Sequence, residues 1–132
     1  MAPTSNSLTF GAPRSAPGYF TVLFTILVIS QQTLALYDPT AAMQPLEIQD
    51  AASVRFIAFT LIAINAYDLI GALQDNWPIY RCSFVSRFFA AALMQYVGGG
   101  WTGLVPVELG SAVVLGACMW YSARGEDQQS DR

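Results

Sequence analysis

The sequence contains no histidine and no lysine, and only 11% of its 132 residues are charged. Soluble domains average about 25% charged residues, so this deficit indicates a protein that lies in a membrane. Histidine is the commonest general base and metal ligand, and we therefore expect neither a metal site nor a cofactor. The six basic residues are all arginines and the net charge is −3. Without a basic patch to neutralise phosphates, nucleic acid is excluded as a partner.

Cysteine is almost as scarce. Cys82 and Cys118 lie far apart in apolar segments, without the spacing of metal ligands. We expect both thiols to be buried and to act as small hydrophobic side chains. The serines lack a histidine that could act as their general base, so nucleophilic serine chemistry has no support.

Hydrophobic residues are abundant, at 54% of the chain. They gather in four segments that approach the length of about 20 residues needed to cross a bilayer. These segments are residues 19–36, 53–73, 79–97 and 101–121. The connections contain Pro, Gly, Asp or Asn, and the first of them, residues 37–52, is expected to be a loop. The last two are short enough to require antiparallel neighbours. The sequence therefore predicts an all-α fold, an antiparallel four-helix transmembrane bundle over residues 19–121.

The two ends of the chain are polar. Residues 1–18, rich in Ser, Pro and Ala, are typical of a disordered N-terminal tail, and residues 122–132 of a short polar C-terminal tail. The first apolar segment has an alternative interpretation, because Thr33–Ala35 resembles a signal-peptidase site. We favour a retained helix over a cleaved signal peptide, because the preceding region is long and weakly positive.

Arginine placement predicts the orientation of this multi-pass integral membrane protein. With four crossings, both termini and the turn at residues 74–78 share one side. That side collects Arg14, Arg81, Arg124 and Arg132. The positive-inside rule then places both termini in the cytoplasm. The organelle stays open, with the endoplasmic reticulum as a working hypothesis.

Aromatic residues near the segment ends are typical of membrane-interface anchors. Tyr67, Tyr80 and Tyr96 are interpreted in this way.

Three charged residues lie well inside the apolar segments: Asp68, Arg87 and Glu108. A charge at the bilayer centre costs roughly 2.5–3.5 kcal/mol, so such residues usually face a bundle interior. With the helical rise, Asp68, Arg87 and the nearby Asn65 lie ~8–12 Å from one face, and Glu108 ~10 Å from the other. We expect these residues to come together.

Each segment also carries a stripe of small and polar residues at helical spacing, expected to face inward. The stripes are Thr21, Thr25 and Gln32; Asn65, Asp68 and Gly71; Ser83, Arg87, Ala90 and Ala91; and Glu108, Ser111, Ala112 and Gly116.

The candidate catalytic residues are Asp68, Glu108 and Arg87, and the candidate binding residues are Asn65, Gln32 and Ser111. One interpretation is a polar pocket that binds or converts a lipophilic small molecule by isomerase- or cyclase-like proton transfer. A carboxyl would move the proton and Arg87 would hold an oxygen-bearing group.

The second interpretation is a non-enzymatic membrane scaffold or assembly subunit, in which Arg87 pairs with Asp68 or Glu108 only to fix the helices. A third is a transporter, which with four helices would need to oligomerise. The expected partners are thus membrane lipid, a lipophilic small molecule and a second copy of the chain.

The stretch from Asn65 to Trp120 contains a Tyr67–Ala72 helix end, a short turn, the run Tyr80–Arg87, a glycine-bearing turn and a last helix with Glu108. In this order of features it resembles small four-helix DoxX-like integral membrane proteins. The overall style is also similar to small membrane proteins encoded with fungal secondary-metabolite enzymes. The resemblance implies a four-helix membrane fold and a role with a lipophilic metabolite, without a single activity.

Overall fold

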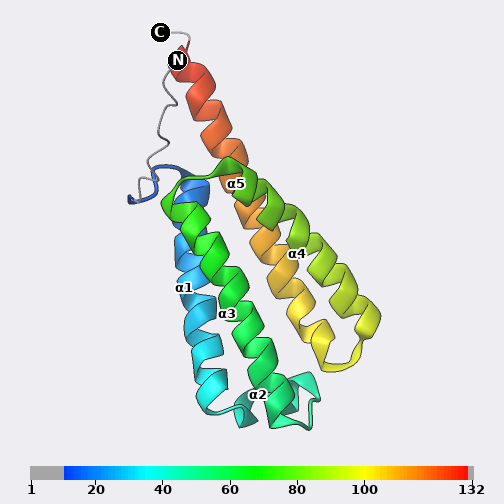
Figure 1. Ribbon diagram of the computed structural model, residues 1–132. Coiled ribbons are helices and arrows are strands. Elements are labelled where there is room, and N and C mark those ends of the chain that lie inside the picture. The colour runs from blue at the N-terminus through cyan, green and yellow to red at the C-terminus, as the bar shows by residue number, and fades with distance from the viewer. Residues whose placement is uncertain (1–10, 131–132) are drawn as a thin grey trace, which may run out of the picture.

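Four long helices run alongside one another in this computed structural model, which describes residues 11–130 and the side chains up to residue 125 (Figure 1). The elements are α1 (Ala16–Tyr37), α2 (Thr40–Leu46), α3 (Ala51–Leu73), α4 (Trp77–Val97), the 3-10 helix η1 (Gly99–Leu104) and α5 (Val105–Ser130). The α3–α4 turn and the start of α1 lie at one end of the bundle, and α2 lies at the other. Over the described residues the prediction of an all-α fold is confirmed.

Local signals set the helix ends. Ser15 caps α1 by accepting a hydrogen bond from the Gly18 amide at 3.3 Å. Asp50 caps α3 by accepting from the amides of Ala52 and Ser53 at 3.2 and 2.8 Å. These bonds satisfy amides that have no partner inside the helix. Gly98, with φ of 76°, ends α4 in a conformation that favours glycine.

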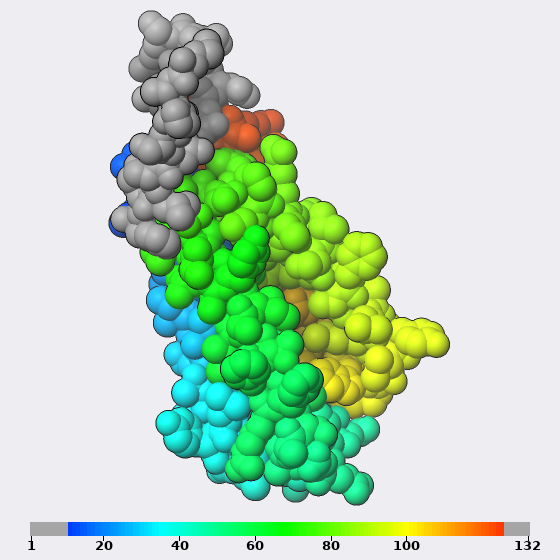
Figure 2. Space-filling model, viewed as in Figure 1, coloured from blue at the N-terminus to red at the C-terminus, as the bar shows by residue number. Residues whose placement is uncertain are grey.

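The long helices form two pairs, with α1 packed along α3 and α4 packed against α5. Contacts between α1 and α5 join the pairs. The helices α3 and α4 diverge from the turn that connects them (Figure 1). Figure 2 shows that the surface is hollowed between α3 and α4, with part of α5 visible inside the hollow.

Burial follows an unusual pattern for a folded chain. Small or polar residues such as Thr25 and Ala72 are fully buried, whereas Leu23, Phe56 and Phe89 are 72%, 71% and 74% exposed. Large exposed apolar surfaces mark contact with another apolar phase. Small and polar residues between the helices permit close packing in a membrane. The inward stripes are therefore confirmed at Thr21, Thr25, Ser83, Arg87 and Ser111, all of which are buried.

Three helical segments are long and apolar enough to cross a membrane: α1, α3 and the segment Gly99–Gly125, which joins η1 to most of α5. These spans are consistent with an integral membrane protein in contact with lipid. The helix α4 is not among them. Its sequence includes Arg81, Ser83, Ser86 and Arg87, which lower its mean hydropathy. The four-helix transmembrane bundle thus stays a prediction.

The chain ends differ from the predicted tails. Of the tail predicted over residues 1–18, residues 1–10 lie outside the described part. Residues 11–18 are not disordered, because Pro13 and Pro17 are buried and α1 begins at Ala16. The helix α5 continues through Ser130, beyond the predicted start of the polar tail. Its last turns are polar but contain no proline, and polarity alone does not end a helix.

Three further expectations were wrong for single residues or a short segment. Tyr80 is fully buried and is not an interface anchor, although Tyr67 and Tyr96 are 60% and 89% exposed. Cys82 is exposed and Cys118 half-buried, so neither thiol is in a tight core. The connection between the first two long helices was expected to be a loop, but it contains the seven-residue helix α2.

Candidate functional site: a polar cluster between helices

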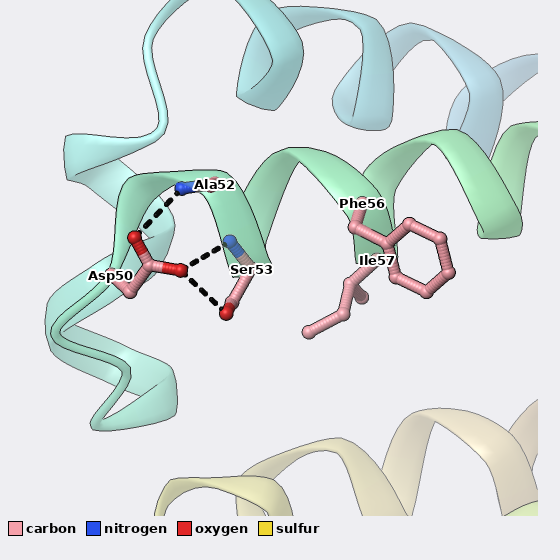
Figure 3. A pocket seen from close by; sticks show the side chains of 5 residues that line it. All are labelled: Asp50, Ala52, Ser53, Phe56 and Ile57. Carbon is pink, nitrogen blue, oxygen red and sulfur yellow. Dashed lines mark hydrogen bonds between the residues drawn. The ribbon is translucent and has the colours of Figure 1, made fainter.

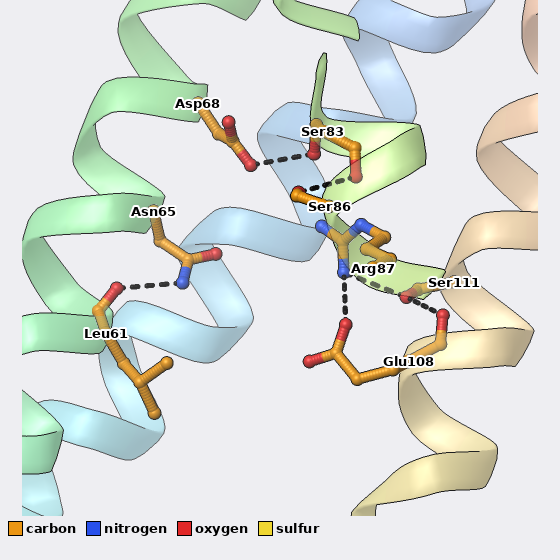
Figure 4. Close-up of polar contacts among 8 residues, drawn as sticks. All are labelled: Leu61, Asn65, Asp68, Ser83, Ser86, Arg87, Glu108 and Ser111. Atoms are coloured by element: carbon orange, nitrogen blue, oxygen red, sulfur yellow. Dashed lines mark hydrogen bonds and ion pairs between the residues drawn. The ribbon is translucent and has the colours of Figure 1, made fainter. Parts of the chain in front are cut away.

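Arg87 is the centre of a group of polar side chains between the helices. This polar cluster consists of Asn65 and Asp68 from α3, Ser83 and Arg87 from α4, and Glu108 and Ser111 from α5 (Figure 4). Arg87 is only 7% exposed. Its Nη1 donates a 2.8 Å hydrogen bond to Ser111 Oγ and lies 3.5 Å from Glu108 Oε2. The predicted pairing of Arg87 with a carboxylate is therefore observed, and the partner is Glu108.

Glu108 occupies the first turn of α5. This helix directly continues η1, and the Val105 amide at its start already donates to Thr102 O. The hydroxyl of Ser111, one turn later, donates to the Glu108 carbonyl oxygen at 2.9 Å while its oxygen accepts from Arg87. The start of α5 thus presents a carboxylate and an oriented hydroxyl to one guanidinium group.

The guanidinium group of Arg87 also contacts α1. The Cζ atom of Arg87 lies 4.3 Å from the centroid of the Phe24 ring, within the range of a cation–π interaction. Arg87 Nε is buried and has no hydrogen-bond partner among the described residues. Arg87 therefore links α4 to both α1 and α5, while its buried Nε has no partner among the described residues.

Asp68 approaches the polar cluster from α3. It is half-buried and accepts a 2.9 Å hydrogen bond from Ser83 Oγ. One turn earlier, Asn65 Nδ2 donates to Leu61 O of its own helix at 2.8 Å. Figure 4 shows the side chains of Asn65 and Asp68 pointing across the bundle toward Arg87. The cluster thus places two carboxyl groups and one guanidinium group between three helices.

Two threonines of α1 complete the buried polar surface. The hydroxyl of Thr25 donates to its own helix at Thr21 O, 2.7 Å away. Thr21 is 3% exposed, and its hydroxyl has no partner among the described residues. Gln32, predicted as a binding residue, lies eight residues beyond Phe24, or ~12 Å along the helix. It is half-buried, and no described hydrogen bond joins it to the polar cluster.

Two cavities lie toward the α2 end of the molecule. One, of about 440 Å³, is lined by Asp50, Ala52, Ser53, Phe56 and Ile57 (Figure 3). The other, of about 480 Å³, is lined by Met43, Gln44, Glu47, Ile48 and Gln49. Neither is lined by a residue of the polar cluster. Asp50, the only charged residue at the first cavity, already caps α3.

A second group of polar residues, which the sequence analysis did not predict, lies at the end of the bundle opposite α2. Asp75 in the α3–α4 turn accepts hydrogen bonds from the Arg14 amide at 3.1 Å, the Ser15 hydroxyl, and the Tyr80 hydroxyl at 2.9 Å. We call these four residues the N-terminal clasp. Burial raises the pKa of Asp75, but the hydrogen bonds outweigh it and hold that pKa below its ordinary value. The clasp thus fixes the start of α1 against the α3–α4 turn.

Comparison of this chain with protein-family models, curated proteins and solved structures finds no match. The assignment of a function therefore depends on the geometry of the polar cluster.

Proposed function

We propose that this protein binds a lipophilic small molecule between α3 and α4, with the polar group of that molecule at the polar cluster. The observation that carries the proposal is the arrangement of Asp68, Arg87 and Glu108. They come from three helices and are only partly paired with one another. Charged groups inside a membrane protein are costly and usually mark a functional pathway or site. The hollow between α3 and α4 offers an apolar molecule a route from the lipid (Figure 2).

The proposal includes conversion of the bound molecule by isomerase- or cyclase-like proton transfer. Asp68 and Glu108 are the groups that would give or take a proton, and Arg87 would hold an oxygen-bearing group. Carboxyl groups held apart in one site suit paired acid and base roles. The resemblance to DoxX-like proteins, and the role in secondary metabolism that it implies, belong to this proposal.

A fourth membrane crossing by α4 is part of the same proposal. This helix begins beside the α3–α4 turn, and the chain after it returns to the α2 end, where Gly100 packs against Pro45 and Leu46. If α3 and α5 cross the membrane, α4 has to connect opposite faces of it. Its 21 residues span ~31 Å, sufficient for the hydrocarbon core. The charged side chain nearest the middle of this helix, Arg87, is buried in the bundle interior.

We further propose that the clasp end faces the cytoplasm. Arg14, Arg81 and Arg124 lie toward this end, while Asp38, Glu47 and Asp50 lie toward the α2 end. The orientation can be tested with a Cys82→Ser, Cys118→Ser background carrying Thr40→Cys or Ser122→Cys. In intact cells or sealed vesicles, an impermeant maleimide should label position 40 only from the non-cytoplasmic face. Labelling of position 122 from that face would reverse the assignment.

The scaffold interpretation is the second candidate, and a specific observation favours it. Arg87 already contacts Ser111, Glu108 and Phe24, which is sufficient to lock α1, α4 and α5 together. In this case the buried charges would serve packing alone. An oligomeric transporter is a third candidate, to be tested by the molecular mass in detergent.

Native mass spectrometry of the purified protein tests the main proposal directly. A bound lipophilic molecule should accompany the wild type and be depleted in Arg87→Met and Glu108→Gln, each of which should remain folded. Thr60→Ala is a matched control, because Thr60 is exposed and bonds only to the backbone of its own helix. Equal ligand occupancy in all variants would refute the proposed site. Aggregation of both single variants with recovery in the double variant would instead establish the scaffold role.

A further inference from the structure

Asp68 and Glu108 are not equivalent within the polar cluster. Glu108 has the guanidinium group of Arg87 at 3.5 Å. The hydrogen-bond donor of Asp68 is instead the neutral hydroxyl of Ser83. Arg87 makes its ion pair with Glu108 and not with Asp68. Asp68 is therefore the carboxyl group of the polar cluster that forms no ion pair with a described residue.

None of the other arginines in the described part of the chain forms an ion pair with Asp68. The sequence has no lysine or histidine, and its basic side chains are six arginines. Arg14 is exposed just before α1, Arg55 bonds to Leu36 O near the start of α3, and Arg124 stacks 3.8 Å from the Trp120 ring. Arg81 is exposed at the start of α4, and Arg132 lies outside the described residues. With both carboxyls ionised, Asp68, Glu108 and Arg87 together carry a formal net charge of −1.

Two buried polar atoms give an independent observation, because neither has a hydrogen-bond partner among the described residues. Arg87 Nε and Thr21 Oγ1 are closed off from solvent and have no hydrogen-bond partner in the described chain. Thr21 is 3% exposed and Arg87 is 7% exposed. Buried polar groups are normally paired, and exceptions require an explanation. Thr21 Oγ1 can accept a hydrogen bond from an ammonium group, whereas Arg87 Nε can only donate and would need an acceptor oxygen elsewhere on the ligand.

We propose that the ligand of this site is a lipophilic amine whose protonated nitrogen pairs with Asp68. The inference rests on the proposed function and names its substrate class. An ammonium group would supply the missing positive charge, and the carbonyl oxygen of Asn65 lies one turn from Asp68 as a further acceptor. A charge in a low-dielectric site is stabilised mainly by a hydrogen-bonded counter-charge. A neutral alcohol gives Asp68 only a hydrogen bond, and a carboxylate ligand would be repelled by it.

Three probes with one ring system and different charges test this assignment: 1-naphthylmethylamine, 1-naphthylmethanol and 1-naphthoic acid. The full chain is reconstituted in phosphatidylcholine nanodiscs, and binding is measured against empty nanodiscs to remove partition into lipid. The wild type should bind the amine at least roughly tenfold more tightly than the alcohol, because only the amine forms an ion pair. Asp68→Asn should reduce this preference to less than about twofold.

Asp50→Asn is the matched control. It makes the same change of carboxylate to amide at the α2 end, and asparagine also caps helices well. It should keep the preference for the amine. If Asp68→Asn does not fold, a diazirine derivative of the amine gives a test on the wild type. Its cross-links should fall on the peptides that contain Asn65–Asp68 or Ser83–Arg87.

The outcomes separate the two proposals. If the alcohol or the acid binds as tightly as the amine, and Arg87→Met abolishes that binding, the amine assignment is wrong while the proposed function stands. Persistence of the amine preference in Asp68→Asn, or cross-links confined to other helices, would also overturn the assignment. If none of the probes binds and no molecule accompanies the purified protein, both proposals fail.

Discussion

The guanidinium carbon of Arg87 lies 4.3 Å from the centroid of the Phe24 ring, so a charge on α4 rests on an aromatic face of α1. These residues are 63 positions apart in the sequence. The contact adds an attraction between the two helix pairs that does not depend on a second charge. A desolvated cation–π interaction contributes about 2 kcal/mol, and an exposed one about 0.5–1 kcal/mol.

Phe24→Leu should therefore lower the free energy of unfolding by about 1–2 kcal/mol, because leucine keeps apolar volume but has no aromatic face. Denaturant-induced unfolding in detergent, followed by tryptophan fluorescence, measures the change. Phe59→Leu is the matched control, since Phe59 is 62% exposed on α3. Equal effects of the two substitutions would show that the Arg87–Phe24 contact adds nothing beyond apolar packing.

Ser111 is expected to matter through one buried hydrogen bond. Ser111→Ala removes the acceptor that lies 2.8 Å from Arg87 Nη1, leaving the more distant Glu108 as the remaining partner of that nitrogen. A buried donor that loses its acceptor costs about 1–3 kcal/mol, and we expect a loss of stability in this range. Ser86→Ala should change stability by less than about 0.5 kcal/mol, because Ser86 is exposed and bonds to Ser83 O of its own helix. A neutral Ser111→Ala substitution would contradict the geometry of the cluster.

The N-terminal clasp should weaken in acid. The folded-state pKa of Asp75 is held below its ordinary value of 3.8, so its stabilising effect is present above that value and is lost as the pH falls through the lowered pKa. Hydrogen exchange of residues 11–18, corrected for the intrinsic effect of pH, should show protection at neutral pH that disappears under strong acid. Asp75→Asn should reduce protection at neutral pH and remove most of its dependence on pH. Unchanged protection in this variant would mean that Asp75 does not hold the clasp.

The sequence predicted which residues face inward because helical spacing determines the face of a residue once the helix is known. Thr25, Ser83, Arg87 and Ser111 were placed correctly for this reason. Spacing does not determine the position along a neighbouring helix. Gln32 shares the face of Thr25, yet it lies too far along α1 to join the polar cluster.

The partner of Arg87 could not be chosen from the sequence. Depth estimates treated the helices as straight parallel rods, and in that picture Asp68 and Glu108 were both within reach. The divergence of α3 from α4 favours the carboxylate on α5 (Figure 1). Phe24 was missed because a phenylalanine in an apolar segment has the same pattern whether it faces lipid or an arginine.

The clasp was missed for a different reason. Residues 11–18 have the composition of a disordered tail, and composition describes only local tendencies. Their contacts with Asp75 connect positions about 60 residues apart, such as Ser15 and Asp75. The buried Tyr80 hydroxyl, which donates to the Asp75 carboxylate, could not be distinguished from an interface anchor without that pairing.

Close packing of Gly71 against Ile79 gives a prediction about the vertex where α3 and α4 meet. A Cβ atom on residue 71 would lie 2.6 Å from Cδ1 and Cγ2 of Ile79 and 2.9 Å from its Cβ. Because the Cβ of Ile79 cannot rotate away, Gly71→Ala should force the helices apart and reduce stability by about 1–3 kcal/mol. Gly110→Ala, in an open position of α5, should instead be neutral or stabilise by up to about 1 kcal/mol.

Truncation of the opposing side chain provides the decisive measurement. Ile79→Ala alone should destabilise the bundle, because Ile79 is only 9% exposed. In the double variant it removes the Cδ1 and Cγ2 atoms that lie 2.6 Å from the new methyl group and keeps only the 2.9 Å contact with Cβ, so most of the clash is relieved. The double variant should therefore be more stable than the sum of the two single effects predicts, with a coupling energy of about 1 kcal/mol or more. Additive effects in the unfolding experiment would show that α3 and α4 do not meet at these residues. In that case α3 and α4 would not diverge from this turn as described. The hollow between them could then not be the entrance to the proposed ligand site.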